Sequence, residues 1–431
     1  MNAVSPNRIK PAKPGVADLD FTEFRKQTDA PSLDELIGRA RALRPLLMEN
    51  QLETERLSQP PLVVQQALLD AGFFKIITPR RYGGWEMGLW AFTKVTMELG
   101  RGCPSTAWCY CLGYGHVYTA AAFFPPQAQD ELFADDGYLC AASFGFPRGK
   151  AQRVEAGYVI TGDFPYGSGS PYSNFYMGEV AAPEGSPHGP PGTPLFFAAR
   201  RDQYEPLDDW HGILGLRGSG SQTIRLHNSF VPDALIVPTN FSMLRAIDGE
   251  TYGYRYHSNS FYRLPQLALA SCYNNAVMVG TAYAALDEYE LVAKTKAPLH
   301  ISALNQPRLK VQAQVPEIQK NFGLAMADVA AAEGILYSST LELDRLGREG
   351  YTPEDEFGIS LRNAVVGKII WKAMEDTLWR TVGSSQGREG CRMERYWRDM
   401  SIFWNSPNNG QREAIATAYS QFRWAATLAE L

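Results

Sequence analysis

The chain has 431 residues, which is enough for two or three domain-sized units or for one large composite. Its content of 45% hydrophobic and 20% charged residues is typical of a globular protein in water. The net charge of −5 and the lack of a lysine- or arginine-rich run argue against nucleic-acid binding. No window approaches the roughly 18 consecutive apolar residues of a membrane span.

The first residues and the cysteines carry no targeting or metal-binding signal. MNAVSPNRIKPAKPG is basic but has no apolar core after it, so we expect a flexible tail over 1–30 rather than a signal peptide. The six cysteines form no CxxC pair and no cluster with metal-ligand spacing. We therefore expect free thiols, no metal site and a cytoplasmic protein.

Helical signals fill residues 31–136, which we predict to form an N-terminal helical domain. Ser32-Leu-Asp-Glu35 is a capping box, and it predicts a helix to about Leu57 that is kinked at Pro45. Further helices are expected over 60–72, 88–99, 105–123 and 127–133.

The pattern changes at Tyr138, where short β-branched or aromatic segments begin to alternate with Gly and Pro. They predict a middle β-domain, a barrel or sandwich, over 137–240, with strands at 138–146, 157–164, 174–182, 195–200 and 222–231. Helical patterns return in 241–431, at 262–296, 309–346, 353–383 and 411–431, and predict a C-terminal four-helix bundle. The fold class is therefore α+β.

A glycine- and serine-rich segment, Trp210 to Pro232, stands out within the β-domain. Four glycines allow tight turns and close backbone approach to a ligand, Arg217 adds a cation, and a strand-like run follows. This is not the dinucleotide fingerprint, because no helix follows the glycines. Taken alone, the segment is more often a loop between strands than a cradle for a ligand.

Four segments, in this order, resemble the acyl-CoA dehydrogenase fold: Gly72–Gly84, Gly100–Val117, Gly162–Gly178 and Gly215–Pro232. More narrowly, they resemble the oxygenase components of two-component aromatic hydroxylases that act on 4-hydroxyphenylacetate or secosteroid phenols. The resemblance implies reduced flavin (FMN or FAD) delivered by a separate NAD(P)H:flavin reductase, and O2. It also implies a homotetramer that oxygenates an aromatic, indolic or amine small molecule through a flavin hydroperoxide.

The resemblance also assigns roles to individual residues. It implies a catalytic group of His116, Ser168 and Ser143. The flavin would be bound by Thr106, Trp108, Ser143, Ser168, Arg217, Ser219, Ser221, Arg263, Gly383 and Ser385. The substrate would be bound by His116, Tyr110, Phe144, Ser170 and Asn405. Without the resemblance, a lone histidine in an aromatic helix is more often a satisfied core residue.

The sequence departs from the family just after Arg395-Tyr-Trp-Arg-Asp399, where related phenol hydroxylases carry one or two histidines, one of which is their candidate base. A gap-free alignment places Ser401 and Ser406 at those positions, and a serine is not a general base. We therefore expect a substrate that is already nucleophilic, such as an amine, indole or thioether, or another base, with His116 the first candidate.

Two other readings stay open. One is a flavin-dependent dehydrogenase or oxidase, whose family base would fall near Ser406-Pro407, with Asp399 and Glu413 the nearest acids. The other is a non-catalytic member that keeps the fold for binding.

Overall fold

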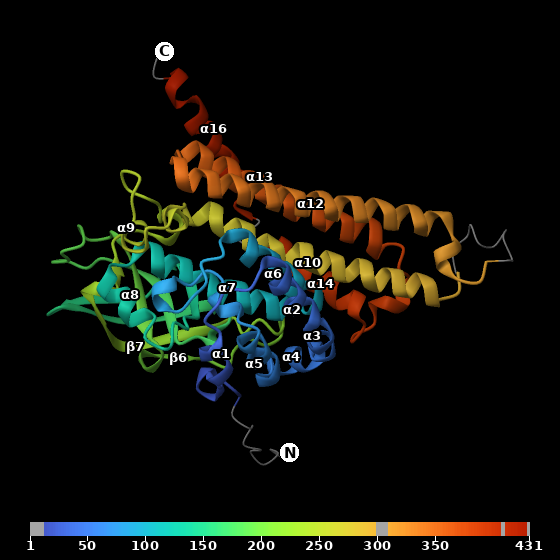
Figure 1. Ribbon diagram of the computed structural model, residues 1–431, viewed down its shortest axis with the longest axis horizontal. Coiled ribbons are helices and arrows are strands. Elements are labelled where there is room, and N and C mark those ends of the chain that lie inside the picture. The colour runs from blue at the N-terminus through green and yellow to red at the C-terminus, as the bar shows by residue number, and fades with distance from the viewer. Residues whose placement is uncertain (1–12, 299–308, 407–409, 429–431) are drawn as a thin grey trace, which may run out of the picture.

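The computed structural model describes residues 13–298, 309–406 and 410–428. Helices come first in the chain, two sheets follow, and long helices complete it (Figure 1). The α+β architecture predicted from the sequence is confirmed. The division at 31–136, 137–240 and 241–431 stays a prediction, as does the tail over 1–30, of which residues 1–12 lie outside the described residues.

The first predicted helix is three helices, so its single kink at Pro45 was wrong. They are α2 (Leu33–Ala42), α3 (Arg44–Glu49) and α4 (Gln51–Leu57). The capping box is present, since the Ser32 side chain accepts a hydrogen bond from the Glu35 amide at 3.2 Å. The chain breaks at Leu43 because Pro45, which lacks an N–H, sits in the first turn of a new helix rather than inside an old one.

The other predicted N-terminal helices are present as α5 (Leu62–Asp70), α6 (Leu89–Gly102), α7 (Pro104–Phe123) and α8 (Pro126–Leu132), after a short α1 (Thr22–Lys26). Every residue of α7 except Leu112 is buried. It packs against the first strand on one side and against the long helix α10 on another. A helix that is apolar all round belongs in the centre of a domain.

Two four-stranded sheets form the middle of the chain. One has the order β1-β4-β5-β8 and the other β2-β3-β7-β6. The five predicted strands are β1 (Ala141–Pro147), β3 (Gly157–Gly167), β4 (Phe175–Ala181), β5 (Pro194–Arg200) and β7 (Gln222–Pro232). The sequence did not indicate β2 (Lys150–Val154), which is polar, or β6 (Tyr204–Pro206) and β8 (Ile236–Val237), which are very short.

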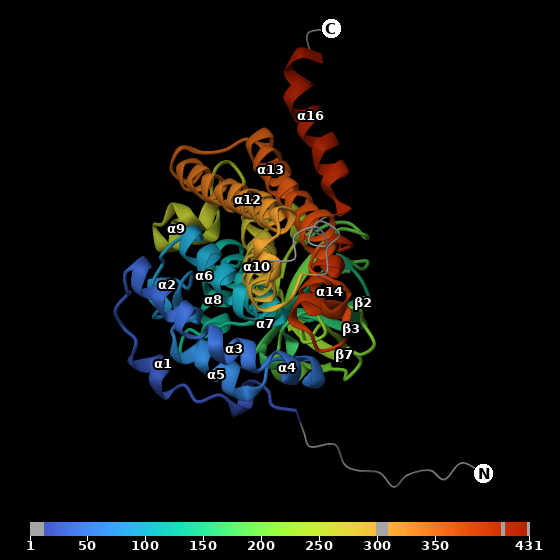
Figure 2. The ribbon, with the colours of Figure 1, turned by 90° about the vertical axis from the view of Figure 1, so that its right-hand side faces the viewer.

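The C-terminal part is a bundle of α10 (Gln266–Thr295), α12 (Pro316–Glu349), α13 (Pro353–Lys372) and α14 (Arg392–Trp404), preceded by α9 (Tyr252–His257). α16 (Arg412–Leu428) projects beyond the other helices (Figure 2). Among the described residues, no helix has the length and apolarity needed to cross a membrane.

Several predicted helix limits in this part were wrong. α10 starts at Gln266 because Pro265 precedes it as the N-cap, and α12 starts only at Pro316. α13 ends at Lys372 and passes into a π-helix over Ala373–Trp379 instead of running on to Gly383. α14 was not predicted as a helix at all.

Two glycines let α6 and α10 approach closely at the centre of the molecule. A Cβ atom on Gly280 would lie 2.1 Å from the carbonyl oxygen of Met97, and one on Gly100 would lie 2.8 Å from that of Val277. Both distances are shorter than any van der Waals contact, so the backbones would have to separate.

We predict that Gly280→Ala lowers the free energy of unfolding by about 1–3 kcal/mol, because the added methyl group overpacks this crossing. The matched control is Gly334→Ala on the exposed face of α12, where a Cβ would meet no atom within 4 Å. That variant should be more stable than the parent by about 0.5–1 kcal/mol, since alanine loses less conformational entropy in a helix. Urea denaturation measures both, and equal effects of the two changes would refute the close crossing.

Candidate active site

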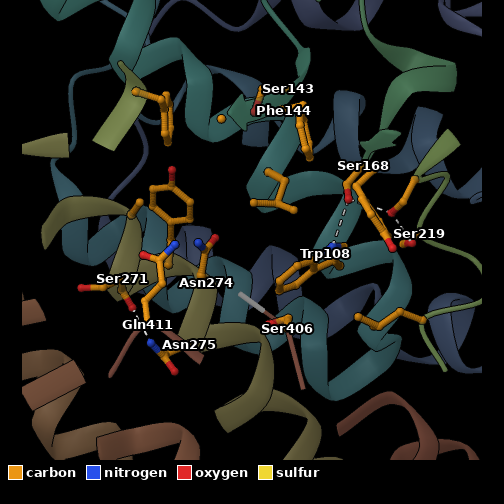
Figure 3. Close-up of a pocket in the computed structure, with 18 of the residues that line it drawn as sticks. Trp108, Ser143, Phe144, Ser168, Ser219, Ser271, Asn274, Asn275, Ser406 and Gln411 are labelled. Carbon is orange, nitrogen blue, oxygen red and sulfur yellow. Dashed lines mark hydrogen bonds between the residues drawn. The ribbon is translucent and has the colours of Figure 1, made fainter. Parts of the chain in front are cut away.

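A cavity of about 480 Å³ lies between the sheets and the helical bundle (Figure 3). Its walls come from α7, β1, α10, α13 and α14, from the start of α16, and from the loop Trp210–Ser221 that precedes β7. The volume is in the range of cavities that hold cofactors and drug-sized ligands.

One face of α7 forms the long wall of the cavity. Trp108, Leu112 and His116 all line it, and residues four apart in a helix lie on the same face. Their separation along the helix axis, from the first to the last, is about 12 Å. The cavity therefore extends over at least two turns of α7.

A chain of hydroxyl groups marks one end of the cavity. The indole N–H of Trp108 donates to the Ser168 hydroxyl at 3.2 Å. The hydroxyls of Ser168 and Ser221 are hydrogen-bonded at 2.7 Å, and those of Ser221 and Ser219 at 2.6 Å. These groups come from α7, from the end of β3 and from the loop before β7, which are far apart in the sequence.

This hydroxyl chain has one hydrogen atom to spare. Each of the three serines carries one hydroxyl hydrogen, and the two links between them use two. Trp108 supplies its own hydrogen, so it does not change that balance. One serine can therefore donate to a ligand in the cavity, whichever direction the chain takes.

His116 lies on the same α7 face as Trp108 and is buried, with an exposed fraction of 3%. Its Nδ1 atom has no hydrogen-bond partner among the described residues. Its ring centre is 5.6 Å from that of Phe241, which also lines the cavity. Burial lowers the pKa of His116 from 6.5 to about 4, so the imidazole is neutral at pH 7.

Amide and hydroxyl side chains form the opposite end of the cavity. Ser271, Asn274 and Asn275 of α10 lie together with Gln411, across Trp108 from Ser168 and Ser219 (Figure 3). The sequence predictions missed all four. Two adjacent asparagines inside a long, largely apolar helix were the available signal, because polar residues on a buried face need partners.

The lining of the cavity, as far as the described residues define it, contains no Asp, Glu, Lys or Arg. Asp399 is buried outside the lining, and Glu413 is exposed on α16. Of the two family histidine positions, Ser406 lines the cavity and Ser401 does not. Both hydroxyls donate to backbone carbonyls of α14, at 2.7 and 2.8 Å. Pro407 lies outside the described residues.

α14 holds the glycine-serine loop in place. The Leu216 amide donates to the Asp399 carboxylate at 2.6 Å, and the Arg398 guanidinium donates to the Leu214 carbonyl at 2.8 Å. Gly215 packs so tightly that a Cβ there would lie 2.2 Å from the Arg398 carbonyl oxygen. Glu55 of α4 pairs with both Arg395 and Arg398 and completes this buried cluster.

Eight of the sequence-predicted site residues line the cavity: Trp108, His116, Ser143, Phe144, Ser168, Ser219, Ser221 and Asn405. Their roles stay predictions. Two neighbours are buried just outside the lining: Thr106, whose hydroxyl has no partner in the described parts of the chain, and Ser170, which donates to the Gly220 carbonyl at 3.0 Å.

Five other predicted site residues are not at the cavity. Tyr110 points into the core, where its hydroxyl donates to the Phe73 carbonyl at 2.8 Å. The Arg217 guanidinium donates to the Ile213 carbonyl at 3.0 Å, and that of Arg263 lies over the Tyr254 ring at 4.9 Å. Gly383 and Ser385 lie near the end of α10, where Lys296 donates to Ser385 at 2.7 Å.

Family models match both helical parts of the chain. The acyl-CoA dehydrogenase N-terminal domain matches residues 40–131, and the acyl-CoA dehydrogenase C-terminal domain matches residues 273–404. The structure of XiaF from a Streptomyces species, solved with FADH2 and glycerol, superposes with a TM-score of 0.80. The identity is 22%, over 91% of this chain and 96% of that one, so this likeness shows the fold.

Relatives identify the branch of the family. The pigment production hydroxylase of a Rhodococcus species is 31% identical over 85% of this chain and 91% of its own length. The flavin-dependent monooxygenase oxygenase subunit HsaA of Rhodococcus jostii is 26% identical over 83% and 90%. The oxygenase component of p-hydroxyphenylacetate 3-hydroxylase from Acinetobacter baumannii is 26% identical over 86% and 85%.

The chain therefore belongs to the flavin-dependent monooxygenases of the acyl-CoA dehydrogenase fold. It is an oxygenase component, and it uses O2 and a reduced flavin that a separate reductase supplies to oxygenate a small molecule. The family, the cofactor and the reaction class expected from the four sequence segments are confirmed.

The carboxyl group that holds the loop makes a testable contribution to stability. Burial raises the pKa of Asp399 from 3.8 to about 7, despite the Leu216 hydrogen bond and the nearby arginines, which lower it. A carboxyl whose pKa is raised in the folded state contributes stability that is fully present below pH 4. That contribution is lost as the pH rises towards 7.

We predict that Asp399→Asn, which keeps an oxygen for the Leu216 amide, removes this pH dependence. The free energy of unfolding of the parent should fall relative to that of the variant between pH 4 and 7, by at most about 1.4 kcal/mol per pH unit. Urea denaturation across this range tests it, with the exposed Asp202→Asn as the control. Parallel curves for the parent and Asp399→Asn would show that this carboxyl does not titrate as described.

Proposed function

We propose that the reduced flavin and the aromatic substrate share the cavity along α7. The observation that carries this is the chain of Trp108, Ser168, Ser221 and Ser219, with one hydroxyl hydrogen to spare. A flavin ring presents nitrogen and oxygen acceptors along its edge, which such a donor suits.

When bound, the reduced flavin supplies the activation of O2. The residues of this chain hold the ring, exclude bulk water and place the substrate. Ser168 would donate a hydrogen bond to the ring edge, Ser143 lines the same space, and the Trp108 indole would form a flat apolar wall against the ring. Excluding water matters because reactive oxygen species are otherwise released before they reach the substrate.

His116 is the residue we assign as proton acceptor. It is the one imidazole in the described lining, it is neutral at pH 7, and its Nδ1 has no partner there. A phenol becomes electron-rich when it loses its proton, so this reaction needs a base. Indoles, amines and thioethers are already electron-rich and need none, so they fit a cavity without the family histidine.

The hypothesis of a flavin-dependent dehydrogenase or oxidase is less well supported. Removal of a proton next to a thioester needs a carboxylate at the ring, and the described lining contains none. Asp399 is hydrogen-bonded to the loop, and Glu413 is exposed. A non-catalytic role would leave the unsatisfied polar groups of the cavity without a purpose.

We further propose that the protein is a homotetramer. Leu324, Tyr337 and Leu341 of α12 are between 45% and 55% exposed, which is unusual for apolar side chains along one helix. Arg217, Gly383 and Ser385 do not line the cavity of their own chain. A neighbouring copy is the place where they would reach a flavin.

The six free cysteines support a reducing, cytoplasmic location.

Oxygen transfer is tested with reduced flavin from an unrelated flavin reductase, indole as substrate and 18O2 as oxidant. We expect 18O in the product, and Ser168→Ala should weaken anaerobic binding of reduced flavin roughly 3- to 10-fold through the lost hydrogen bond. Ser229→Ala, which removes a hydroxyl outside the cavity, is the control. Substrate oxidation without 18O would favour a dehydrogenase, and lack of flavin binding would favour a non-catalytic protein.

The role of His116 is tested by comparing a phenol with an indole. We expect His116→Gln to reduce phenol turnover about 100-fold or more and to change indole turnover far less. In the parent, phenol turnover should fall only below about pH 4, where His116 becomes protonated. His257→Gln is the matched control, since burial lowers the pKa of that histidine to about 4 outside the cavity. Full phenol turnover by His116→Gln would remove His116 from the mechanism.

A further inference from the structure

The amide end of the cavity, formed by Ser271, Asn274, Asn275 and Gln411, faces the hydroxyl chain from the other side of Trp108 (Figure 3). A substrate whose ring lies near the flavin would extend its substituent towards these residues. This reasoning rests on the proposed function, because it takes the hydroxyl chain as the flavin side.

The hydrogen bonds already made at this end leave a donor and an acceptor free. The Asn275 amide nitrogen donates to the Ser271 carbonyl at 2.8 Å, and the Ser271 hydroxyl is used by Ala268 and Asn363. Within the described residues, the Asn275 amide oxygen and the Asn274 amide nitrogen have no partner. The Asn274 oxygen receives only a Cys111 thiol at 4.0 Å.

These two asparagines are buried, with exposed fractions of 7% for Asn274 and 6% for Asn275. Both side chains line the cavity, so a ligand there can supply the missing partners, and each hydrogen bond gained contributes roughly 0.5–1.5 kcal/mol. A carboxamide or a hydroxyl can both donate and accept, as this pair requires.

The charge at this end is as informative as its hydrogen bonds. The described lining has no cation, and His116 is neutral at pH 7. Arg412 follows Gln411 in the chain, but its guanidinium lies 5.7 Å from the Trp404 ring centre and does not line the cavity. Arg245, the partner of buried Glu356, is also outside the lining. A carboxylate here would be buried without a counter-ion, which is strongly unfavourable.

We infer that this enzyme selects aromatic substrates with an uncharged hydrogen-bonding substituent, such as a carboxamide or hydroxyl, held by Asn274 and Asn275. It therefore selects against aromatic substrates whose substituent is a carboxylate. The relative named for p-hydroxyphenylacetate acts, by its name, on a substrate of that acidic kind.

Matched pairs of ligands test this directly. Indole-3-acetamide is compared with indole-3-acetate, and 4-hydroxyphenylacetamide with 4-hydroxyphenylacetate, at pH 7.5, by isothermal titration calorimetry of the full chain with bound flavin. We expect each amide to bind roughly 10- to 100-fold more tightly than its acid, which corresponds to one or two satisfied buried groups.

Variants then locate the preference. Asn274→Leu should weaken amide binding about 10-fold and change the binding of unsubstituted indole far less. Gln411→Lys should tighten binding of the acids at least about fivefold by supplying a cation at this end. Gln421→Lys on the exposed side of α16 changes the net charge equally and should have no effect.

Acids that bind as tightly as their amides, or binding of neither member of any pair, would overturn the inference. So would an unchanged amide preference in Asn274→Leu. These outcomes are distinct from failure of the proposed function, because 18O transfer to indole does not involve a substituent. Transfer to indole without an amide preference would refute only the substrate class, whereas loss of transfer with the amide preference intact would refute only the oxygenase assignment.

Discussion

The hydrogen bond from the Leu216 amide to the buried Asp399 carboxylate ties the glycine-serine loop to α14, and the site depends on it. The loop carries Ser219 and Ser221, so its position decides whether their hydroxyls meet Ser168 and Trp108. Arg398 of α14 and Gly215 of the loop reinforce this attachment, one from each of the two segments in contact. A carboxylate kept inside the protein for this purpose is costly alone, and the arginines beside it offset part of that cost.

The second constraint is that the cavity is polar but uncharged over its described surface. Serine hydroxyls at one end and carboxamides at the other can orient a ligand without holding an ion. Two arginines close in sequence to lining residues, Arg217 and Arg412, contact a backbone carbonyl and an aromatic ring and do not line the cavity. A neutral interior also keeps His116 deprotonated, because burial without a negative partner disfavours its charged form.

Much of this arrangement could be predicted from the sequence. Local patterns and short motifs predict the flavin family, the helix through Trp108 and His116, and the strand that follows Trp210–Ser221. Tyr110 shows the limit of that approach. It lies two residues from Trp108, but a helical step of two residues turns it to the opposite side, where its hydroxyl bonds Phe73. Asn274 and Asn275 were missed because no motif marks them and α10 lies about 160 residues away from α7 in the chain.

The sequence by itself determined the order of helices and strands, the flavin-binding family and the loss of the histidine after Asp399. These properties are local, since hydrophobic periodicity, turn residues and short motifs act over a few positions. Only the tertiary structure decided which polar groups share one cavity, that Asp399 holds a loop instead of lining that cavity, and that the described part of the lining carries no charge. Those properties depend on contacts between segments distant in the chain, and periodicity within one segment contains no information about them.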